Sequence, residues 1–452
     1  MHILKGYTKQ EISWMMYDWA NSAHSVIIVT LLPIFFDTVA GYTADSVSSM
    51  STWGYATSIA MLIVALAAPF LGVFGDIRGM RKKLFSFFML LGVAACAGMA
   101  FTPGMDFTSG PVAAGKVASL ILVLYIVSVI GFDASAIYYD AFLTDVTTED
   151  RMDKVSTMGY GLGYICGSTI PLLIFLIMNL VGVPMLTCLA VVFGLTAVWW
   201  LAFSLPLLKN CEQTSGKPYE KGDVARSIKG VGTTIKEIIA NKPMLIYILS
   251  YFFYIDGVHT VISMATTYGT NLGLDSTGMM LALLLVQILG LPFCLLYIKC
   301  SEKFGARTMV GFGICVYMFI CIFAFFMNSL WQFWVLAVLC ATSQGGIQAL
   351  SRSMYGKLIP DKDRSGEFFG FFDIFGKFSS IMGPALVGVV SSVVANGILG
   401  AQGLTAQTAT AEQIDAINAQ SSHYGILSII IIIIVGAVLY FGFLPKAEHA
   451  KQ

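Results

Sequence analysis

Long apolar segments separated by short polar ones fill most of the chain. A helix rises 1.5 Å per residue, so it needs roughly 20 largely apolar residues to cross a bilayer. Twelve segments meet this condition, at residues 12–39, 51–74, 84–103, 117–145, 155–180, 183–206, 244–270, 277–298, 307–328, 330–356, 367–395 and 424–444. The pattern predicts an all-α membrane protein with twelve transmembrane helices.

The basic residues between these segments predict how the helices are oriented. Of the 26 Lys and Arg residues, Lys116 alone falls in a loop on one side, and Arg352 and Lys377 fall inside spans. The others lie on the opposite side, which is the cytoplasm by the positive-inside rule. An even number of crossings then places both termini in the cytoplasm.

The composition agrees with a membrane protein and narrows the classes of function. Hydrophobic residues make up 57% of the chain and charged residues 12%, and the mean hydropathy is +0.79, well outside the range of soluble proteins. The net charge is zero, so no overall positive field favours nucleic acid as a partner. The nine cysteines lie in or beside apolar segments and form no Cys-x-x-Cys motif, so we interpret them as small core residues.

The longest charged stretch, residues 207–243, divides the spans into two groups of six. We therefore expect an N-terminal six-helix bundle at 1–206, a cytoplasmic central loop at 207–243 and a C-terminal six-helix bundle at 244–452. Within the loop, residues 224–240 fit either an amphipathic helix on the membrane surface or a solvated linker. A short helix at 411–420 is expected in the external loop before the last span.

The two groups of spans contain short matching segments in the same order. DIRGMRKK after the second span corresponds to EKFGARTM after the eighth, Asp150-Arg151 to Asp363-Arg364, and His24 in the first span to His259 in the seventh. The first match aligns Asp76 with Glu302 and Arg81 with Arg307. Three matches in one order indicate an internal repeat of two six-helix halves.

The turn after the second span carries a Gly-x3-Asp-x2-Gly-x-Arg-Lys pattern from Gly72 to Lys82. With twelve spans and a central loop, this pattern resembles the major facilitator superfamily. The resemblance implies two pseudo-symmetric six-helix bundles, and a latch in which charged groups of the two turns pair reversibly at the inner face. Asp140 and Arg352 fall near the same membrane boundary. The latch candidates are Asp76, Arg81, Asp140, Glu302, Arg307 and Arg352; a purely topological role for the basic residues stays open.

Three further motifs point to one branch of that superfamily. They are YDWANSA near the N terminus, GGIQALSRSMYGKLIP at 345–360 and EFFGFFDIFGKFSSIMGP at 367–384. They resemble the yeast vacuolar autophagy-related amino-acid effluxer and its bacterial relatives, and the short central loop is typical of the bacterial proteins. The resemblance implies a secondary transporter in the bacterial inner membrane, with amino acids as the substrate class.

Polar side chains inside the first and seventh spans need an explanation, because a charged group at the centre of a membrane helix costs about 2.5 to 3.5 kcal/mol. Residues three or four apart share a helix face, and both sets lie near mid-membrane. We interpret them as the walls of a central cavity. Candidate substrate-binding residues are Asn21, His24, Ser25, Asp256 and His259; candidate proton carriers are Asp18, Asp133, Asp256 and His259. Neutral histidines without a coupling role, and sodium in place of protons, stay open.

The eleventh span holds Asp373 and Lys377, four residues apart among phenylalanines. They form either a structural ion pair or part of the substrate site, in which Lys377 receives an anionic group. Gln344 in the tenth span is a further candidate for substrate binding.

The sequence lacks the motifs of other function classes. It has no Walker-type loop for ATP hydrolysis and neither HExxH nor GxSxG, and its five histidines are dispersed. We therefore expect no enzyme, no cofactor and no metal. The predicted function is monomeric secondary active transport of a small polar or zwitterionic solute, coupled to H+, by alternating access. A transporter or flippase of an amphiphile such as a lysolipid is the alternative.

Overall fold

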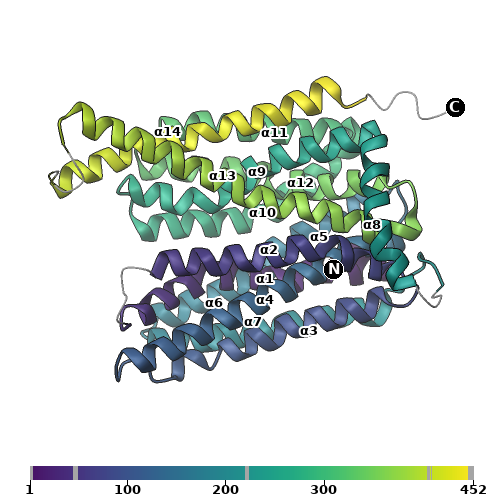
Figure 1. The fold of residues 1–452 in the computed structure, drawn as a ribbon, viewed down its shortest axis with the longest axis horizontal. Coiled ribbons are helices and arrows are strands. Elements are labelled where there is room, and N and C mark those ends of the chain that lie inside the picture. The colour runs from purple at the N-terminus through teal and green to yellow at the C-terminus, as the bar shows by residue number, and fades with distance from the viewer. Residues whose placement is uncertain (1–3, 44–48, 219–222, 405–407, 409, 446–452) are drawn as a thin grey trace. The chain divides into compact units, whose positions relative to one another are not determined.

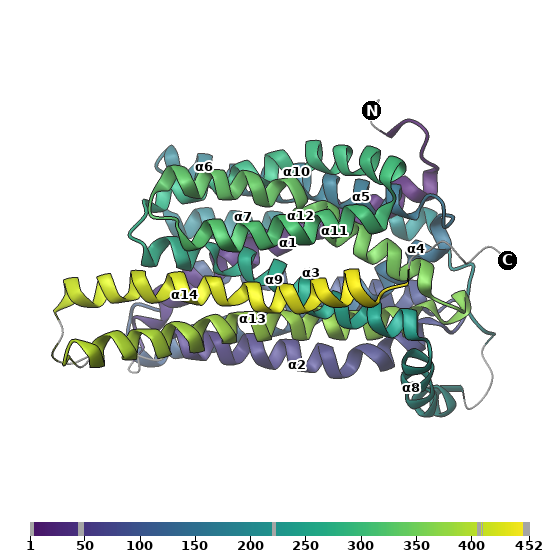
Figure 2. The ribbon, with the colours of Figure 1, turned by 90° about the horizontal axis from the view of Figure 1, so that it is seen from above.

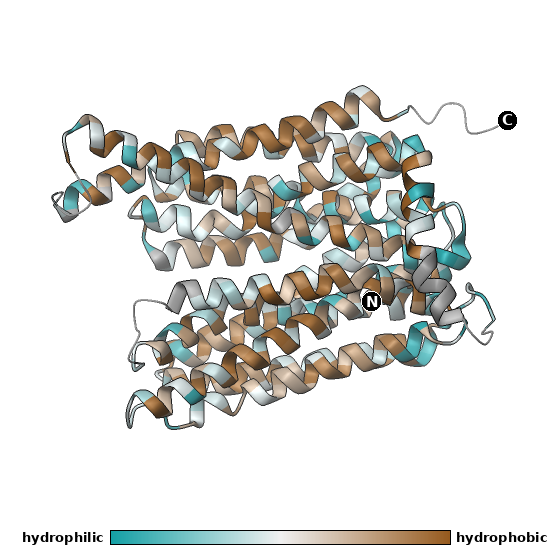
Figure 3. Cartoon of the chain, in the orientation of Figure 1, coloured by the Kyte–Doolittle hydropathy of each residue, from teal (hydrophilic) through white to brown (hydrophobic). Residues whose placement is uncertain are grey.

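The computed structural model describes residues 4–43, 49–218, 223–404, 408 and 410–445. These residues form helices joined by loops, with one isolated bridge between Ile77 and Lys217. Within these described ranges, twelve helical segments are long and apolar enough to cross a membrane, which confirms the predicted number of spans. Figure 3 shows apolar residues along the helices and polar residues gathered at helix ends.

The helices follow the predicted order along the chain (Figure 1). The first six spans are α1 (Lys9–Ala40), α2 (Ser49–Gly75), α3 (Arg81–Met99), α4 (Pro111–Val146), the continuous α5 (Met152–Leu162), η4 (Gly163–Ser168) and α6 (Thr169–Leu180), and α7 (Met185–Asn210). The linker helix is α8 (Asp223–Ala240). The last six spans are α9 (Lys242–Asn271), α10 (Ser276–Phe304), α11 (Ala306–Phe325), α12 (Leu330–Leu358), α13 (Ser365–Ala401), and α14 (Ala411–Val438) with η6 (Leu439–Phe443).

Two helices near the C terminus are longer than predicted. α13 continues to Ala401, and the short helix predicted at 411–420 is the first part of α14. The Thr410 hydroxyl accepts a hydrogen bond from the Gln413 amide at 3.3 Å, and the Thr410 amide donates to Gln413 Oε1 at 2.9 Å. This capping box starts the helix within polar sequence, where Ala, Glu and Gln favour helix without an apolar surrounding.

The chain forms two compact units. The first comprises residues 1–234 and 356–374, and the second comprises residues 235–355 and 375–452. The first part of α13 therefore belongs to the first unit and the rest of α13 to the second. The bundle limits expected at residues 206 and 244 stay a prediction.

In the first unit, α1 packs against α4, α5 and α7, and α3 packs against α4 and α7. Large aromatic side chains fill this core. The ring of Trp14 stacks on Tyr139 with centroids 4.4 Å apart, and Trp14 Nε1 donates a hydrogen bond to the Tyr139 carbonyl at 2.8 Å. Trp200 of α7 is also fully buried. Much of the polarity in the first span is therefore satisfied inside its own unit.

A glycine-rich stretch allows α1 to approach the fifth span closely. A Cβ atom at Gly163 would lie 2.5 Å from Ser22 Oγ, and one at Gly167 would lie 2.5 Å from the Trp19 carbonyl oxygen. The stretch is the π-helix η4, a local widening of the helix that is frequent at functional sites. Any larger residue at these two glycines would push the helices apart.

In the second unit, α9 packs against α14 and α11. A Cβ at Gly257 would lie 2.2 Å from Ile433 Cγ1, and Ser250 Oγ donates to the Gly436 carbonyl at 2.9 Å. Figure 2 shows the second part of α13 beside α14, and a Cβ at Gly425 would meet the Ser391 side chain. The pair α9–α14 corresponds to the pair α1–α7, because each joins the first and last spans of a six-helix half.

Candidate functional site

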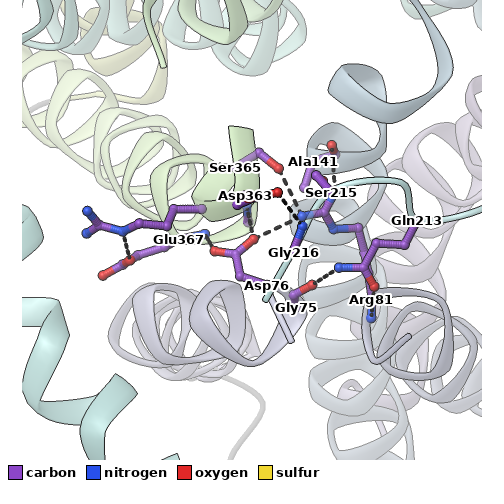
Figure 4. Close-up of polar contacts among 12 residues, drawn as sticks. Gly75, Asp76, Arg81, Ala141, Gln213, Ser215, Gly216, Asp363, Ser365 and Glu367 are labelled. Carbon is purple, nitrogen blue, oxygen red and sulfur yellow. Dashed lines mark hydrogen bonds and ion pairs between the residues drawn. The ribbon is translucent and has the colours of Figure 1, made fainter. Parts of the chain in front are cut away.

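The turn between α2 and α3 holds a buried ionic cluster (Figure 4). Arg81, the first residue of α3, is fully buried. Its Nη2 lies 2.9 Å from Asp76 Oδ1 and its Nη1 lies 2.5 Å from Asp145 Oδ2. The guanidinium also donates to the Ala141 carbonyl and to the hydroxyls of Ser215 and Ser365. A buried charge needs such complete pairing, since desolvation is costly.

One guanidinium serves two carboxylates in this cluster. Burial raises the pKa of Asp76 to about 7, although Arg81 and two backbone amides lower it in part. Asp76 lies just beyond the last residue of α2, at the end of a membrane-spanning segment. Its carboxyl group therefore titrates in the neutral range.

Asp76 also caps α13 within the first unit. Its Oδ1 accepts from the Gly366 amide at 2.7 Å, and its Oδ2 accepts from the Glu367 amide at 2.8 Å. A carboxylate at this position satisfies free amides of a helix N-terminus and interacts favourably with the helix dipole. A Cβ at Gly72 would lie 2.2 Å from the Gly366 carbonyl oxygen. Only glycine at position 72 brings α2 close enough for both hydrogen bonds.

The start of the central loop closes over the same turn. Gln213 Oε1 accepts from the Gly79 amide at 2.8 Å, and its Nε2 donates to the Gly75 carbonyl at 2.9 Å. Gly79 has a φ of +81°, which glycine adopts without strain. Asp145 Oδ1 accepts from the Ser215 amide at 2.9 Å. This part of the loop is thus bound to the turn.

The linker helix α8 reaches the same end of α13. The buried Thr234 hydroxyl donates to Glu367 Oε1 at 2.5 Å and accepts a hydrogen bond from Arg364. Arg364 Nε in turn lies 3.0 Å from Glu367 Oε2. Residue 234 thus joins α8 to the residues that begin α13. The cluster of Asp76, Arg81, Asp145, Thr234, Arg364 and Glu367 is called the α13 clasp here.

The structure brings together two of the six predicted latch residues, Asp76 and Arg81, in the α13 clasp. Asp140 is half-buried in α4, one turn before Asp145, and Arg352 is buried in α12. Glu302 is exposed at the end of α10. Arg307 instead donates to the carbonyls of Leu444 and Pro445, at the end of the last span. The second turn therefore makes different contacts from the first.

His24 lies in the core of the first unit. Its ring stacks on Phe132 with centroids 4.7 Å apart and packs against Trp200 at 5.2 Å, while Nε2 lies 3.3 Å from Ser128 Oγ. Tyr17, two turns earlier, shares a hydrogen bond of 2.7 Å with Ser135 Oγ. These contacts account for the imidazole as a packed core group.

The other polar candidates of α1 point elsewhere. A Cβ at Gly159 would lie 2.3 Å from Asp18 Oδ2, so the buried Asp18 carboxylate lies against α5. Asn21 is half-buried and Ser25 is exposed in the described structure. Asp133, in α4, is buried. Only Asn21 and Ser25 of this group thus keep a surface on which a solute can make contact.

Asp256 of α9 is fully buried in the second unit. Its Oδ1 accepts from the Gly383 amide of α13 at 2.9 Å and lies 3.4 Å from Thr260 Oγ1. Among the described residues, its Oδ2 has no hydrogen-bond partner. A buried carboxylate with one unsatisfied oxygen is unusual, since such groups are nearly always paired.

A second set of polar residues on α9, α12 and α13 comprises His259, Gln344, Gln348 and Lys377 and is called the polar track here. The His259 side chain hydrogen-bonds Gln348 and lies within electrostatic range of Lys377. Gln348 Nε2 donates to the Gln344 carbonyl at 3.2 Å. His259, Gln344 and Lys377 are all half-buried. Two of the predicted substrate-binding residues, His259 and Lys377, thus lie within electrostatic range of each other, and Gln348 links His259 to the backbone of Gln344. Asp373 is half-buried on α13, four residues before Lys377.

Gln344 also borders an apolar cavity of about 90 Å³ inside the second unit. Its walls come from α9, α10, α11, α12 and α14, and include Val261, Ile262, Leu283, Val286 and Leu336. The cavity is smaller than the roughly 150 Å³ known to accept benzene, so its size suits a short aliphatic group. Among the residues that the structure describes, no three His, Cys, Asp or Glu side chains group to hold a metal ion.

Sequence reasoning did not find Asp145, Thr234, Gly366 or Glu367. Asp145 stands at the end of the fourth span, and Glu367 is the first acidic residue of the eleventh. Both lie at a membrane boundary, and this position could have marked them as candidates. The contact of Thr234 with Glu367 joins residues 133 positions apart. No local sequence pattern predicts such a contact.

The chain matches known proteins along most of its length. The family described as "Vacuole effluxer Atg22 like" matches residues 39–151 and 144–397. The MFS-type transporter YxiO of Bacillus subtilis is 40% identical over 452 residues, which cover 98% of this chain and 96% of that protein. Autophagy-related protein 22-1 of Aspergillus niger is 25% identical over 262 residues, which cover 53% of this chain and 42% of that relative.

Solved structures share the fold at low sequence identity. The proton:xylose symporter XylE has a TM-score of 0.69 at 15% identity, covering 97% of this chain and 95% of that one. A bacterial homologue of the iron transporter ferroportin, in its outward-facing state, has a TM-score of 0.63 at 14% identity, covering 96% and 98%. The fold is that of the major facilitator superfamily. The chain therefore belongs to the Atg22-like branch of that superfamily and is a membrane transporter, not an enzyme.

Proposed function

We propose that this transporter moves small zwitterionic solutes, amino acids with short aliphatic side chains, by alternating access coupled to protons. The observation that carries the proposal is the continuity between the polar track and the apolar cavity of the second unit. Lys377 offers a cation for a carboxylate, and Gln344, whose backbone carbonyl accepts a hydrogen bond from Gln348, lines the cavity. A zwitterion with an aliphatic side chain presents these two chemistries together.

The α13 clasp supports a latch role for the first turn. Asp76 holds the first amides of α13, and the rest of α13 carries Lys377. Release of the clasp therefore frees the beginning of the helix that contributes to the substrate site. We take the clasp to be closed in one of the two access states and open in the other. The transporter then lies in the inner membrane, and the clasp faces the cytoplasm.

Counterflow in proteoliposomes tests the substrate class. Vesicles loaded with unlabelled leucine should take up radiolabelled leucine, and Lys377→Met should reduce this exchange by at least about tenfold, because a lost charge-assisted hydrogen bond costs roughly 1.5 to 3 kcal/mol. Lys299→Met is the matched control, since it makes the same replacement at an exposed position of α10. Equal exchange by both variants would remove Lys377 from the site.

A lysolipid or another amphiphile is the second candidate, and the apolar lining of the cavity favours it. Fluorescent lysophospholipid should then cross the vesicle membrane faster in the presence of the protein, while leucine exchange stays at the level of empty vesicles. Leucine counterflow without lysolipid movement excludes this candidate.

A further inference from the structure

α13 contains a proline at the point where it meets Asp256. Pro384 lies inside the helix, and a proline within a helix removes one backbone hydrogen bond and bends the chain. The residue before it, Gly383, donates its amide to Asp256 Oδ1 at 2.9 Å. The backbone of α13 is therefore joined to a carboxylate of α9 at the point where proline weakens the helix.

The two helices touch at this point with no space between them. A Cβ at Gly383 would lie 1.8 Å from Thr260 Oγ1 and 2.7 Å from Asp256 Oδ1. Glycine is thus required at position 383 for the hydrogen bond to form, as it is at Gly366 near the start of the helix. The contact belongs wholly to the second unit.

Asp256 has an incomplete set of partners for a charged group. Its Oδ2 is buried without a hydrogen bond among the described residues, and the Thr260 hydroxyl is distant at 3.4 Å. An ionised carboxylate in a medium of low dielectric constant is costly in this state, and a bound proton removes the cost. From this geometry we propose that Asp256 carries the coupled proton, and that its protonation controls the bend of α13 at Gly383–Pro384.

The controlling step is one proton added to Asp256 Oδ2 from one side of the membrane and released to the other. No other bond is made or broken except the hydrogen bond to Gly383. A carboxylate accepts a hydrogen bond about twice as strongly as a neutral group does. The charged form therefore holds α13 bent against α9, and the neutral form lets the helix relax.

The Gly383 amide and the Thr260 hydroxyl contact Asp256 itself, and the other polar groups of the surrounding helices lie farther along. His259 follows on α9, Lys377 precedes Gly383 by six residues on α13, and Gln348 of α12 hydrogen-bonds His259. The α14 side chains at the adjacent Gly257 are Ile429 and Ile433. A change in the bend thus moves Lys377 relative to His259. This step rests on the proposed function, because it couples the proton to the substrate site.

Spin labels measure the bend directly and need no substrate. The pair Thr270→Cys on α9 and Ser392→Cys on α13, in a chain without its nine native cysteines, reports the distance between the two helices. Residue 392 lies about 13 Å beyond Gly383, so a change of 20° in the bend moves it by about 5 Å. We expect this shift between pH 5.5 and pH 8, and its loss in Asp256→Asn.

Two more variants keep the test decisive if Asp256→Asn folds poorly. Pro384→Ala should also abolish the shift, because the straightened helix has no bend to release. Gly388→Ala should leave the shift intact, since nothing lies within 4 Å of a Cβ at that position. A pH-dependent shift of the same size in Asp256→Asn, or none in the unmodified chain, would overturn the proposal.

Transport measurements separate this inference from the proposed function. A pH gradient should raise leucine accumulation several-fold in the unmodified protein and should have no effect in Asp256→Asn. If the unmodified protein exchanges no leucine, the proposed substrate is wrong, and the spin-label distances still decide the role of Asp256. If leucine accumulation in Asp256→Asn responds fully to the gradient, the inference fails while the proposed substrate stands.

Discussion

Replacing Gly72 by alanine should open the α13 clasp. The new Cβ would lie 2.2 Å from the Gly366 carbonyl oxygen and 2.8 Å from its carbon, and 3.0 Å from Glu367 Cα. Carbon and other heavy atoms rest about 3.5 to 4.0 Å apart, so α2 and α13 must separate by more than about 1 Å. The amides of residues 366 and 367, now 2.7 and 2.8 Å from Asp76, then lie beyond hydrogen-bond distance.

The magnitude follows from the two hydrogen bonds. Above pH 7, where Asp76 is ionised, each joins an amide to a charged acceptor and contributes about 1.5 to 3 kcal/mol in a buried setting. Water that enters the gap replaces part of this energy, so we expect a net loss of about 3 kcal/mol. Amides protected by the clasp should then exchange with deuterium about 100-fold faster. Mass spectrometry of a peptide from the first turn of α13 measures this rate.

Gly388→Ala is the matched control, because it makes the same change within α13 where a Cβ meets no atom within 4 Å. Alanine favours helix over glycine by about 1 kcal/mol, so this variant should exchange no faster than the unmodified protein. The reasoning is refuted if Gly72→Ala and Gly388→Ala show the same exchange rates near residue 366.

Three other outcomes are expected. Burial raises the pKa of Asp76 from 3.8 to about 7, so the closed clasp binds a proton that the open clasp releases. The closed clasp should therefore be most stable below pH 4 and lose stability as the pH rises to 7, which falling protection factors at Gly366 would show. Asp76→Asn should remove this pH dependence. Thr234→Val should speed exchange in the first turn of α13 about tenfold, whereas Thr233→Val, at an exposed neighbour, should not. His24→Ala should lower the free energy of unfolding by about 2 to 4 kcal/mol through lost packing, measured by denaturation in detergent, and leave the pH response of uptake unchanged.

Much of the fold could be predicted because each membrane span is visible in the sequence as one continuous apolar segment. The bilayer requires a continuous apolar length and internal pairing of every backbone group, so the helix is the only available element. The predicted limits agree with the helices within a few residues at most ends. They fail at α14, where helix propensity continues through polar sequence before Ile426.

The site was less predictable, because a polar side chain on a helix can find hydrogen-bond partners on any of several neighbouring helices. His24 and His259 occupy matching places in the repeated sequence, yet the first packs between aromatic rings and the second joins Gln348 near Lys377. Spacing along a helix shows which residues share a face. It does not show whether that face meets the core of its own unit or a solute.

The sequence by itself determined that this chain spans a membrane twelve times, carries a charged turn after its second span and belongs to a family of transporters. Only the tertiary structure decided which groups the charges meet. The amides of Gly366 and Gly383 become partners of Asp76 and Asp256 because glycines let helices approach within hydrogen-bond distance. Such contacts join residues more than a hundred positions apart, and their energy depends on distances that no local pattern contains.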